Sequence, residues 1–330
     1  MRRLKCIAKV GCIAKEPIIE CVPNFSEGKD VGKVMAIIRA MQVDGVYLLD
    51  YSLDQDHNRS VVTIAGSPAA VIEAAIRAVG KAAELVNLTE QRGVHPRIGA
   101  ADVLPFVPVS SVSLADCATF ARQAGVQIWR RYGVPVYFYG AAAARPDRVE
   151  LENVRRGQFE GLLEASLRDA SRRPDVGGPE LHPTAGASAV GARSFLIAYN
   201  VYLAPLPPGA GRSAALADLG AARAIARDIR ASSGGLHGVK ALAVMANGRA
   251  QVSMNVTDFR VTSMRRVHEA VRALASRHGA APAEGELIGL IPEEAFDPGS
   301  DWAAETTNLD PSLKILERRL EQPMAWPEAF

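Results

Sequence analysis

The sequence predicts an α+β protein of two α/β sandwich subdomains, each with the element order βαββαβ, and a ligand cleft between them. Strand-like and helix-like hydrophobic patterns follow one another in the same order in both halves of the chain. Asn247-Gly248 separates two alternating runs, which is the strongest short-range hairpin signal because both turn positions need a positive φ. A Pro- and Gly-rich segment, 172–187, joins the halves.

The N-terminal half begins with a strand, a helix, two strands and a second helix. A long polar connection, 87–104, precedes the next strand, and a helix and a strand extend the unit. Short apolar runs indicate the strands, and apolar residues at helical spacing indicate the helices. The expected strands are 18–22, 46–51, 60–65, 105–109 and 134–139, and the expected helices are 29–41, 68–86 and 114–131.

The C-terminal half has the clearer pattern. Residues 194–203 place Phe195, Ile197 and Tyr199 on one side of a strand. The expected strands are 194–203, 237–246, 249–257 and 286–291, and the expected helices are 213–230 and 263–275. This order is that of the split βαβ, or ferredoxin-like, unit. We therefore expect an extension at 1–16 and subdomains at 17–187 and 188–330.

The composition is that of an ordinary globular protein. The chain has 330 residues, is 48% hydrophobic and carries a net charge of +2. That balance argues against a nucleic-acid or membrane-surface partner, because such partners need a concentrated basic field. The longest uncharged run of residues 1–16 is too short for a signal peptide, and no apolar run approaches a membrane span. The four cysteines form no CxxC pair, so reduced thiols and a cytoplasmic location are expected.

Motif searches exclude several classes of site. The sequence contains no Walker motif, no GxGxxG after a strand and no GxSxG elbow. Asp54, Asp56 and His57 could suggest a metal ion, but such a cluster is more often a solvated turn, so no metal is expected.

The strongest candidate for chemistry is His95, in Gly93-Val94-His95-Pro96-Arg97-Ile98-Gly99. Pro96 restricts His95 to an extended backbone, and the flanking glycines allow close approach of the backbone to a ligand. Arg97 places a cation two residues away that suits a carboxylate. Taken alone, a histidine in a loop is more often a solvated residue. His57 and His182 are the other histidines that could belong to a site.

Polar residues on two strands form a second candidate feature. Gln251, Ser253 and Asn255 share one face of a strand, and Asn200 interrupts an otherwise apolar strand. A solvent-facing sheet surface is the simpler explanation for any one of them. Two such strips facing one cleft would suit the amide-like edge of a pterin.

Several motifs, in order from about residue 17 to about 320, together resemble the glutamate formimidoyltransferase family. They are Glu20-Cys21-Val22-Pro23-Asn24-Phe25-Ser26-Glu27-Gly28, Asp56-His57-Asn58-Arg59-Ser60-Val61, Gly93-Val94-His95-Pro96-Arg97-Ile98-Gly99-Ala100, Gly191-Ala192-Arg193 and Gln251-Val252-Ser253-Met254-Asn255. Any one of these motifs is weak, but their joint spacing is specific.

The resemblance implies a function. His95 would be the catalytic residue, and the family's folate-binding segment falls on Gly177–Gly186. Members are two ferredoxin-like subdomains with the ligand between them, usually dimeric. They transfer a formimidoyl group from N-formimidoyl-L-glutamate to N5 of tetrahydrofolate, as co-substrate, in histidine degradation. His95 would take the N5 proton and return one to the departing glutamate nitrogen.

The expected binding residues follow from these motifs. Arg59, Arg97 and Arg193 are candidates for the carboxylates of substrate and folate, because a guanidinium binds a carboxylate through two hydrogen bonds. The full set is Asn24, Asn58, Arg59, Arg97, Gly177, Gly178, Pro179, Glu180, Leu181, His182, Pro183, Thr184, Ala185, Gly186, Arg193, Asn200 and Asn255.

The sequence also departs from the family pattern. Val94 stands where Glu often precedes the HPR motif, and Ser52 stands where some members have an acidic residue. Residues 1–16 have no counterpart in the family pattern, and no C-terminal cyclodeaminase domain is expected. Two alternatives stay open: a formyltransferase that uses N-formylglutamate, and a folate-binding protein without catalytic activity.

Overall fold

The computed structural model describes residues 16–93, 95–204, 212–246 and 248–328, without the side chains of 212–217. The chain divides into two compact units, Met1–Arg193 with Leu320–Phe330, and Ser194–Arg319. The α+β class is confirmed, with a large mixed sheet in the first unit and an antiparallel sheet in the second. A ligand cleft between two ferredoxin-like subdomains stays a prediction. Most of the expected extension 1–16 lies outside the described residues.

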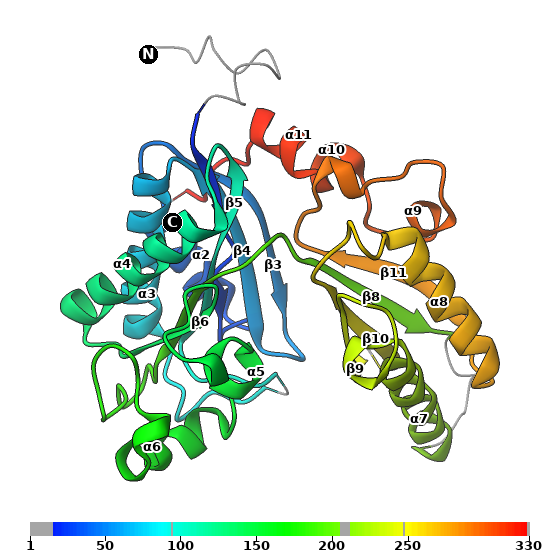
Figure 1. Ribbon diagram of the computed structural model, residues 1–330, viewed down its shortest axis with the longest axis horizontal. Coiled ribbons are helices and arrows are strands. Elements are labelled where there is room, and N and C mark those ends of the chain that lie inside the picture. The colour runs from blue at the N-terminus through cyan, green and yellow to red at the C-terminus, as the bar shows by residue number, and fades with distance from the viewer. Residues whose placement is uncertain (1–15, 94, 205–211, 247, 329–330) are drawn as a thin grey trace. The chain divides into compact units, whose positions relative to one another are not determined.

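The first unit contains a seven-stranded sheet ordered β1-β4-β2-β5-β7-β6, with β3 paired to β4 (Figure 1). β7 runs parallel to β5 and β6, and the other pairs are antiparallel. The strands are β1 Ile18–Cys21, β2 Asn24–Phe25, β3 Val46–Asp54, β4 Arg59–Gly66, β5 Ala101–Ser110, β6 Val136–Gly140 and β7 Ser188–Ala192. The five expected strands are present. The sequence did not indicate β2, which has two residues, or β7, whose small side chains show no clear period.

Helices cover both faces of this sheet. α2 (Val31–Ala40), α3 (Pro68–Leu85) and α4 (Leu114–Tyr132) lie along one face, over the main hydrophobic core (Figure 1). Ser113 begins α4 with a capping box, since its hydroxyl accepts from the Asp116 amide and the Asp116 carboxylate accepts in return. Alternate residues of β5, β6 and β7 point the other way, into a smaller cluster with α5 (Leu151–Val154) and α6 (Gln158–Arg168). The sequence did not predict α5 or α6.

The second unit has the predicted order βαββαβ. Its four-stranded antiparallel sheet is ordered β11-β8-β10-β9, and α7 and α8 pack on it (Figure 1). The elements are β8 Ile197–Leu203, α7 Arg212–Ile229, β9 Val239–Ala246, β10 Arg249–Val256, α8 Met264–Arg277 and β11 Pro282–Ile288. The alternation expected for β8 is confirmed, because Ile197, Tyr199 and Val201 belong to the hydrophobic core of the second unit and the adjacent Tyr202 does not. The predicted hairpin joins β9 to β10, although Asn247 lies outside the described residues.

The C-terminal segment contains short helices that the sequence did not indicate, α9 (Asp301–Ala304), α10 (Pro311–Lys314) and α11 (Leu316–Glu321). The chain then returns to the first unit, where the Met324 amide donates to the Leu48 carbonyl over 2.8 Å. None of the helices in the described ranges is long and apolar enough to span a membrane. Cys21 and Cys117 are buried and not in a disulfide, and Cys6 and Cys12 lie outside the described residues.

Candidate active site

His95 lies in the connection between α3 and β5, and glycines fix the path of this loop. A Cβ atom added to Gly93 would come within 2.4 Å of the His57 carbonyl oxygen, and one added to Gly99 within 2.1 Å of the Ala187 carbonyl oxygen. Both glycines therefore allow the loop to approach neighbouring backbone, which differs from the close approach to a ligand expected from sequence. Together they hold the ends of the loop that carries His95.

Asn58 connects two of the family-like motifs with the residue that precedes a third. Its Oδ1 accepts from the Gly28 amide over 3.0 Å, and its Nδ2 donates to the Arg92 carbonyl over 2.8 Å. Its backbone is left-handed, with φ 48°, a conformation that asparagine tolerates better than most residues. These contacts make Asn58 a structural link between segments, and leave its side chain engaged with the protein.

Three of the predicted site residues come together around the guanidinium of Arg59. The Nη1 atom of Arg59 lies 2.8 Å from Nδ1 of His95. Arg59 also donates to Oδ1 of Asn24, from Nε over 3.1 Å and from Nη2. The side chain of Arg59 is 15% exposed, so the hydrogen bonds form in a largely desolvated site. Asn24, Arg59 and His95 thus form one continuous chain of contacts.

Asp102 binds the guanidinium of Arg59 from the buried side of these contacts. It was not among the site residues predicted from sequence. Its side chain is fully buried, and Oδ2 accepts from Nη1 of Arg59 over 3.1 Å and contacts Nη2 of Arg155. Oδ1 accepts from the Ile98 amide over 2.8 Å, three residues after His95. Burial raises the pKa of this carboxyl, but Arg155 and Arg59 outweigh it and hold the pKa below its ordinary value.

The environment of His95 favours a neutral ring. Burial, together with the nearby cations Arg59 and Arg155, lowers the pKa of His95 to about 3, and the opposite effect of Asp102 is smaller. Nδ1 also lies 2.8 Å from the carbonyl oxygen of Pro96. A neutral imidazole can accept or donate a proton, which is the requirement for general acid/base chemistry.

His57 lies next to His95, and its pKa is shifted in the opposite direction. Its Nδ1 lies 2.6 Å from Oδ2 of Asp54, and this hydrogen bond raises the pKa of His57 more than burial lowers it. The two imidazole rings are edge to face, with centroids 6.2 Å apart. In the part of the chain that the structure describes, no group of three His, Cys, Asp or Glu side chains could hold a metal ion.

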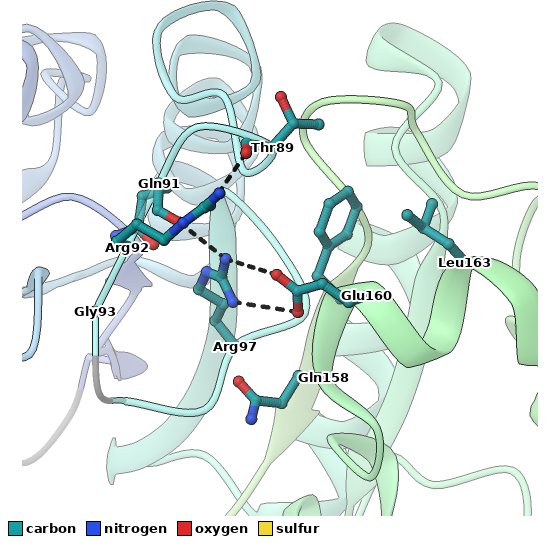
Figure 2. A pocket seen from close by; sticks show the side chains of 9 residues that line it. Thr89, Gln91, Arg92, Gly93, Arg97, Gln158, Glu160 and Leu163 are labelled. Atoms are coloured by element: carbon teal, nitrogen blue, oxygen red, sulfur yellow. Dashed lines mark hydrogen bonds and ion pairs between the residues drawn. The ribbon is translucent and has the colours of Figure 1, made fainter.

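Arg97 lines a cavity of about 540 Å³ beside the His95 loop (Figure 2). Its guanidinium is bonded to Glu160 and to the carbonyls of Leu88 and Gln91. Two buried polar atoms of the lining, Nε of Arg97 and Oε1 of Gln91, have no hydrogen-bond partner among the described residues. The cavity lies within the first unit, and its walls are Thr89, Gln91, Arg92, Gly93, Arg97, Gln158, Phe159, Glu160 and Leu163.

The segment predicted to bind folate is fastened to the His95 loop at its C-terminal end. The Leu88 amide donates to Thr184 over 2.8 Å, and the Ala100 amide donates to Ala185 over 2.9 Å. Leu181 is buried in the smaller hydrophobic cluster of the first unit. The N-terminal part of the segment is more accessible to solvent, because Gly178, Pro179 and Glu180 are exposed.

The other residues of this segment hold its turn. His182 accepts from the Ala185 amide through Nδ1 over 3.0 Å, and Gly186, with φ 68°, pairs with His182 and Gly99. A Cβ atom at Gly177 would strike the ring of Trp129 at 2.5 Å. Pro183 lies between the buried Leu181 and the bonded Thr184.

The remaining predicted residues lie elsewhere. Arg193 follows β7, and its amide donates to the Phe106 carbonyl over 3.2 Å. Asn200 is on β8 opposite Ser253, and its Nδ2 lies 3.3 Å from Oε2 of Glu286. Asn255 is exposed on β10. Asn200 and Asn255 therefore share the second sheet, and their part in a site with His95 stays a prediction.

The sequence contained a usable signal for Asp102 and none for Arg155. Asp102 is the only charged residue in an apolar run that becomes β5, so burial of a carboxylate could have been inferred. Arg155 belongs to an Arg-Arg pair in a polar stretch, a pattern that usually indicates a solvated surface.

Comparisons with known proteins agree with these motifs. A family model described as the formiminotransferase domain, N-terminal subdomain, matches residues 18–193, and one described as the formiminotransferase domain matches residues 210–313. A glutamate formimidoyltransferase of Thermoplasma acidophilum is 41% identical over 92% of this chain and 98% of its own. One from Streptococcus pyogenes serotype M1 is 39% identical, with the same coverage. The mouse formimidoyltransferase-cyclodeaminase is 38% identical over 84% of this chain and 51% of its own length.

Proposed function

Because the chain belongs to the formiminotransferase family, we propose that it transfers a formimidoyl group from N-formimidoyl-L-glutamate to N5 of tetrahydrofolate. The observation that carries this proposal is the chain of contacts from Asn24 through Arg59 to His95. The loop that contains His95 is hydrogen-bonded to the joining segment. Tetrahydrofolate is the co-substrate, and no metal takes part.

His95 is the general acid/base of this reaction. N5 must lose a proton as it bonds to the formimidoyl carbon, and the glutamate nitrogen must gain one as it leaves. A histidine positioned for both transfers contributes roughly 10²–10⁴ in rate. The low pKa of His95 supports this role, because the ring stays neutral at pH 7 and a neutral imidazole can donate or accept a proton. No covalent enzyme intermediate is needed, since binding both substrates together supplies much of the acceleration.

The substrates bind on either side of the His95 loop. We assign a carboxylate of the glutamate donor to the cavity beside Arg97, because a guanidinium binds a carboxylate through charge-assisted hydrogen bonds. We assign the pterin of folate to the exposed part of the joining segment, Gly178–Glu180. Arg193, Asn200 and Asn255 are the remaining candidates for folate contacts.

In its biological setting, the reaction belongs to histidine degradation and folate one-carbon metabolism. The protein acts in the cytoplasm on two small molecules, as a homodimer, without nucleic acid or membrane partners. These assignments rest on the family and on the balanced charge of the chain.

The decisive experiment offers purified protein each of two donors with tetrahydrofolate. Formation of 5-formimidoyltetrahydrofolate from N-formimidoyl-L-glutamate, followed by absorbance, is the expected result. The His95→Ala variant serves as the matched control for non-enzymatic transfer. Formyl transfer from N-formylglutamate alone would correct the donor. Tight binding of folate without turnover of either donor would identify a binding protein and end the enzymatic proposal.

A further inference from the structure

The Nδ1 atom of His95 lies within hydrogen-bond distance of both a donor and an acceptor. Nη1 of Arg59 lies at 2.8 Å and can only donate a hydrogen bond. The carbonyl oxygen of Pro96 also lies at 2.8 Å and can only accept one. A neutral imidazole carries a single N–H, so Nδ1 satisfies one of these neighbours and not both.

Of the two possible hydrogen bonds at Nδ1, the one donated by Arg59 is the stronger. A hydrogen bond from a charged donor is worth roughly twice one between neutral groups. A proton on Nδ1 would also set an N–H against a guanidinium N–H. Arg59 has little freedom to turn away, because Asn24 and Asp102 engage its three nitrogen atoms together with His95. The lone pair of neutral His95 therefore lies on Nδ1, and its proton lies on Nε2.

We propose that Arg59 and Asp102 are positioning residues that keep the proton of neutral His95 on Nε2, so that His95 acts first as a proton donor to the donor substrate. This inference rests on the proposed transfer reaction for its chemistry. Asp102 acts through both of its oxygens, since Oδ2 binds Arg59 and Oδ1 holds the His95 loop through the Ile98 amide.

The proposed sequence of proton transfers balances. As N5 bonds to the formimidoyl carbon, the C=N electron pair moves to the imino nitrogen, which takes the Nε2 proton. The ring, now anionic beside Arg59, takes the proton that N5 releases and is neutral again. In the second half, Nε2 protonates the glutamate nitrogen as its bond to carbon breaks. Nε2 then takes a proton from the remaining amino nitrogen as the C=N bond forms again.

The charges around His95 are consistent with this order. Arg59 comes from β4, Asp102 from β5, Arg155 from the end of α5, and His57 from the turn between β3 and β4. Burial lowers the pKa of His95, and the excess of two arginines over one carboxylate lowers it further. Such a site disfavours an imidazolium, so a neutral ring has to supply the proton.

The test measures the tautomer directly by NMR of protein labelled with ¹⁵N in its histidine rings. The signals of His95 are assigned with His95→Gln. We expect a neutral ring with its proton on Nε2 from about pH 5 to pH 9. A neutral ring in the wild type with its proton on Nδ1 would overturn the inference without any variant being needed.

Two variants test the positioning residues. Arg59→Gln removes the cation, so we expect the tautomer to shift toward Nδ1–H and the pKa of His95 to rise. Asp102→Asn should shift the same signals and lower kcat by roughly 10²–10⁴, the range for losing a carboxylate that fixes a histidine tautomer. Arg77→Gln, on the exposed surface of α3, is the matched control and should leave the His95 signals unchanged.

The outcomes separate the two proposals. If Arg59→Gln leaves the tautomer and pKa of His95 unchanged, the positioning role is wrong. The spectrum requires no substrate, so failure of the transfer assay with every donor would count against the proposed function and leave the tautomer result standing.

Discussion

The guanidinium of Arg97 meets the carboxylate of Glu160 with two nitrogen atoms, Nη2 to Oε1 at 3.0 Å and Nη1 to Oε2 at 3.4 Å (Figure 2). The two partners differ in exposure, since the side chain of Arg97 is 9% exposed and that of Glu160 is 60% exposed. Nη2 also donates to the carbonyls of Leu88 and Gln91. Arg97 therefore connects the loop on one side of the cavity to the start of α6 on the other.

Arg97→Lys is predicted to weaken both stability and donor binding. Lysine keeps the charge but loses the planar fork that satisfies Glu160 and the two carbonyls together. The loss of one or two charge-assisted hydrogen bonds should cost about 1–3 kcal/mol in the free energy of unfolding, measured by urea denaturation. If Arg97 also binds the donor carboxylate, KM for the donor should rise several-fold.

Glu160→Gln is the control that separates these two roles. It weakens the ion pair but leaves the Arg97 guanidinium in place, so stability should fall. KM for the donor should stay unchanged or fall, because a competing anion is removed from the cavity wall. Unchanged kinetics for both substrates in Arg97→Lys would mean that Arg97 only supports the structure.

His95→Ala is predicted to lower kcat by roughly 10²–10⁴, the usual contribution of a general acid/base. The affinity for folate, measured by equilibrium binding, should change little because the methyl side chain leaves the folate contacts intact. A fully active variant would remove the central claim and direct attention to His57 or His182.

The low pKa of His95 predicts a loss of stability in acid. The folded-state pKa is about 3, below the ordinary value of 6.5, so the unfolded chain binds a proton that the folded protein does not. The contribution of His95 is complete above about pH 6.5 and is lost progressively as the pH falls toward 3. The free energy of unfolding of His95→Gln should fall less steeply than that of the wild type between pH 6.5 and pH 4.5. Parallel curves would show that His95 titrates normally.

His57 should affect stability in the opposite direction. Its hydrogen bond to Asp54 raises its pKa, so its stabilisation is complete below about pH 6.5 and is lost as the pH rises through the folded-state pKa. Thermal unfolding of His57→Gln should show a deficit relative to wild type at pH 5.5 that shrinks by pH 8.5. If the loss of thermal stability in His57→Gln is the same at both pH values, His57 stabilises the protein through packing and not through its charge.

The sequence predicted regular elements well where local pattern and burial agree. β8 alternates in sequence and its apolar face is buried, and the hairpin between β9 and β10 follows from Asn247-Gly248. β7 was missed, because its short side chains give no period and its place beside β5 is set by long-range parallel pairing. Residues 188–193 therefore belong to the first unit.

The site was predictable only in part. The motif around His95 pointed to its chemistry, but the partners of its ring come from β4, β5 and α5, which no local pattern brings together. His268 on α8 is a separate case, because a lone histidine within a helix is usually solvated. It is 3% exposed, because it lies one turn after Met264 and beside Val267 on the buried face of α8. Its Nδ1 lies 3.3 Å from the Tyr199 hydroxyl.

The joining segment 172–187 offers a test of the folate site by amide exchange. Amides bonded within the first unit, such as those of Asp175, Val176 and Ala187, are already protected in the free protein. The exposed stretch Gly178–Glu180 has the most to gain from a ligand. If folate binds there, a reduced folate should slow exchange in this stretch by ordering it and by excluding water.

The turn at Gly248 provides the internal control. It lies between β9 and β10 at the end of the second sheet and serves only to reverse the chain, so its exchange should hardly change when folate is added. Slower exchange at Gly178–Glu180 with no change at Gly248 would locate the ligand on the joining segment. Protection confined to the strands that carry Asn200 and Asn255, with none in 172–187, would make the segment a plain linker. The pterin would then lie on the polar face of the second sheet, where Asn200 and Ser253 are paired across β8 and β10.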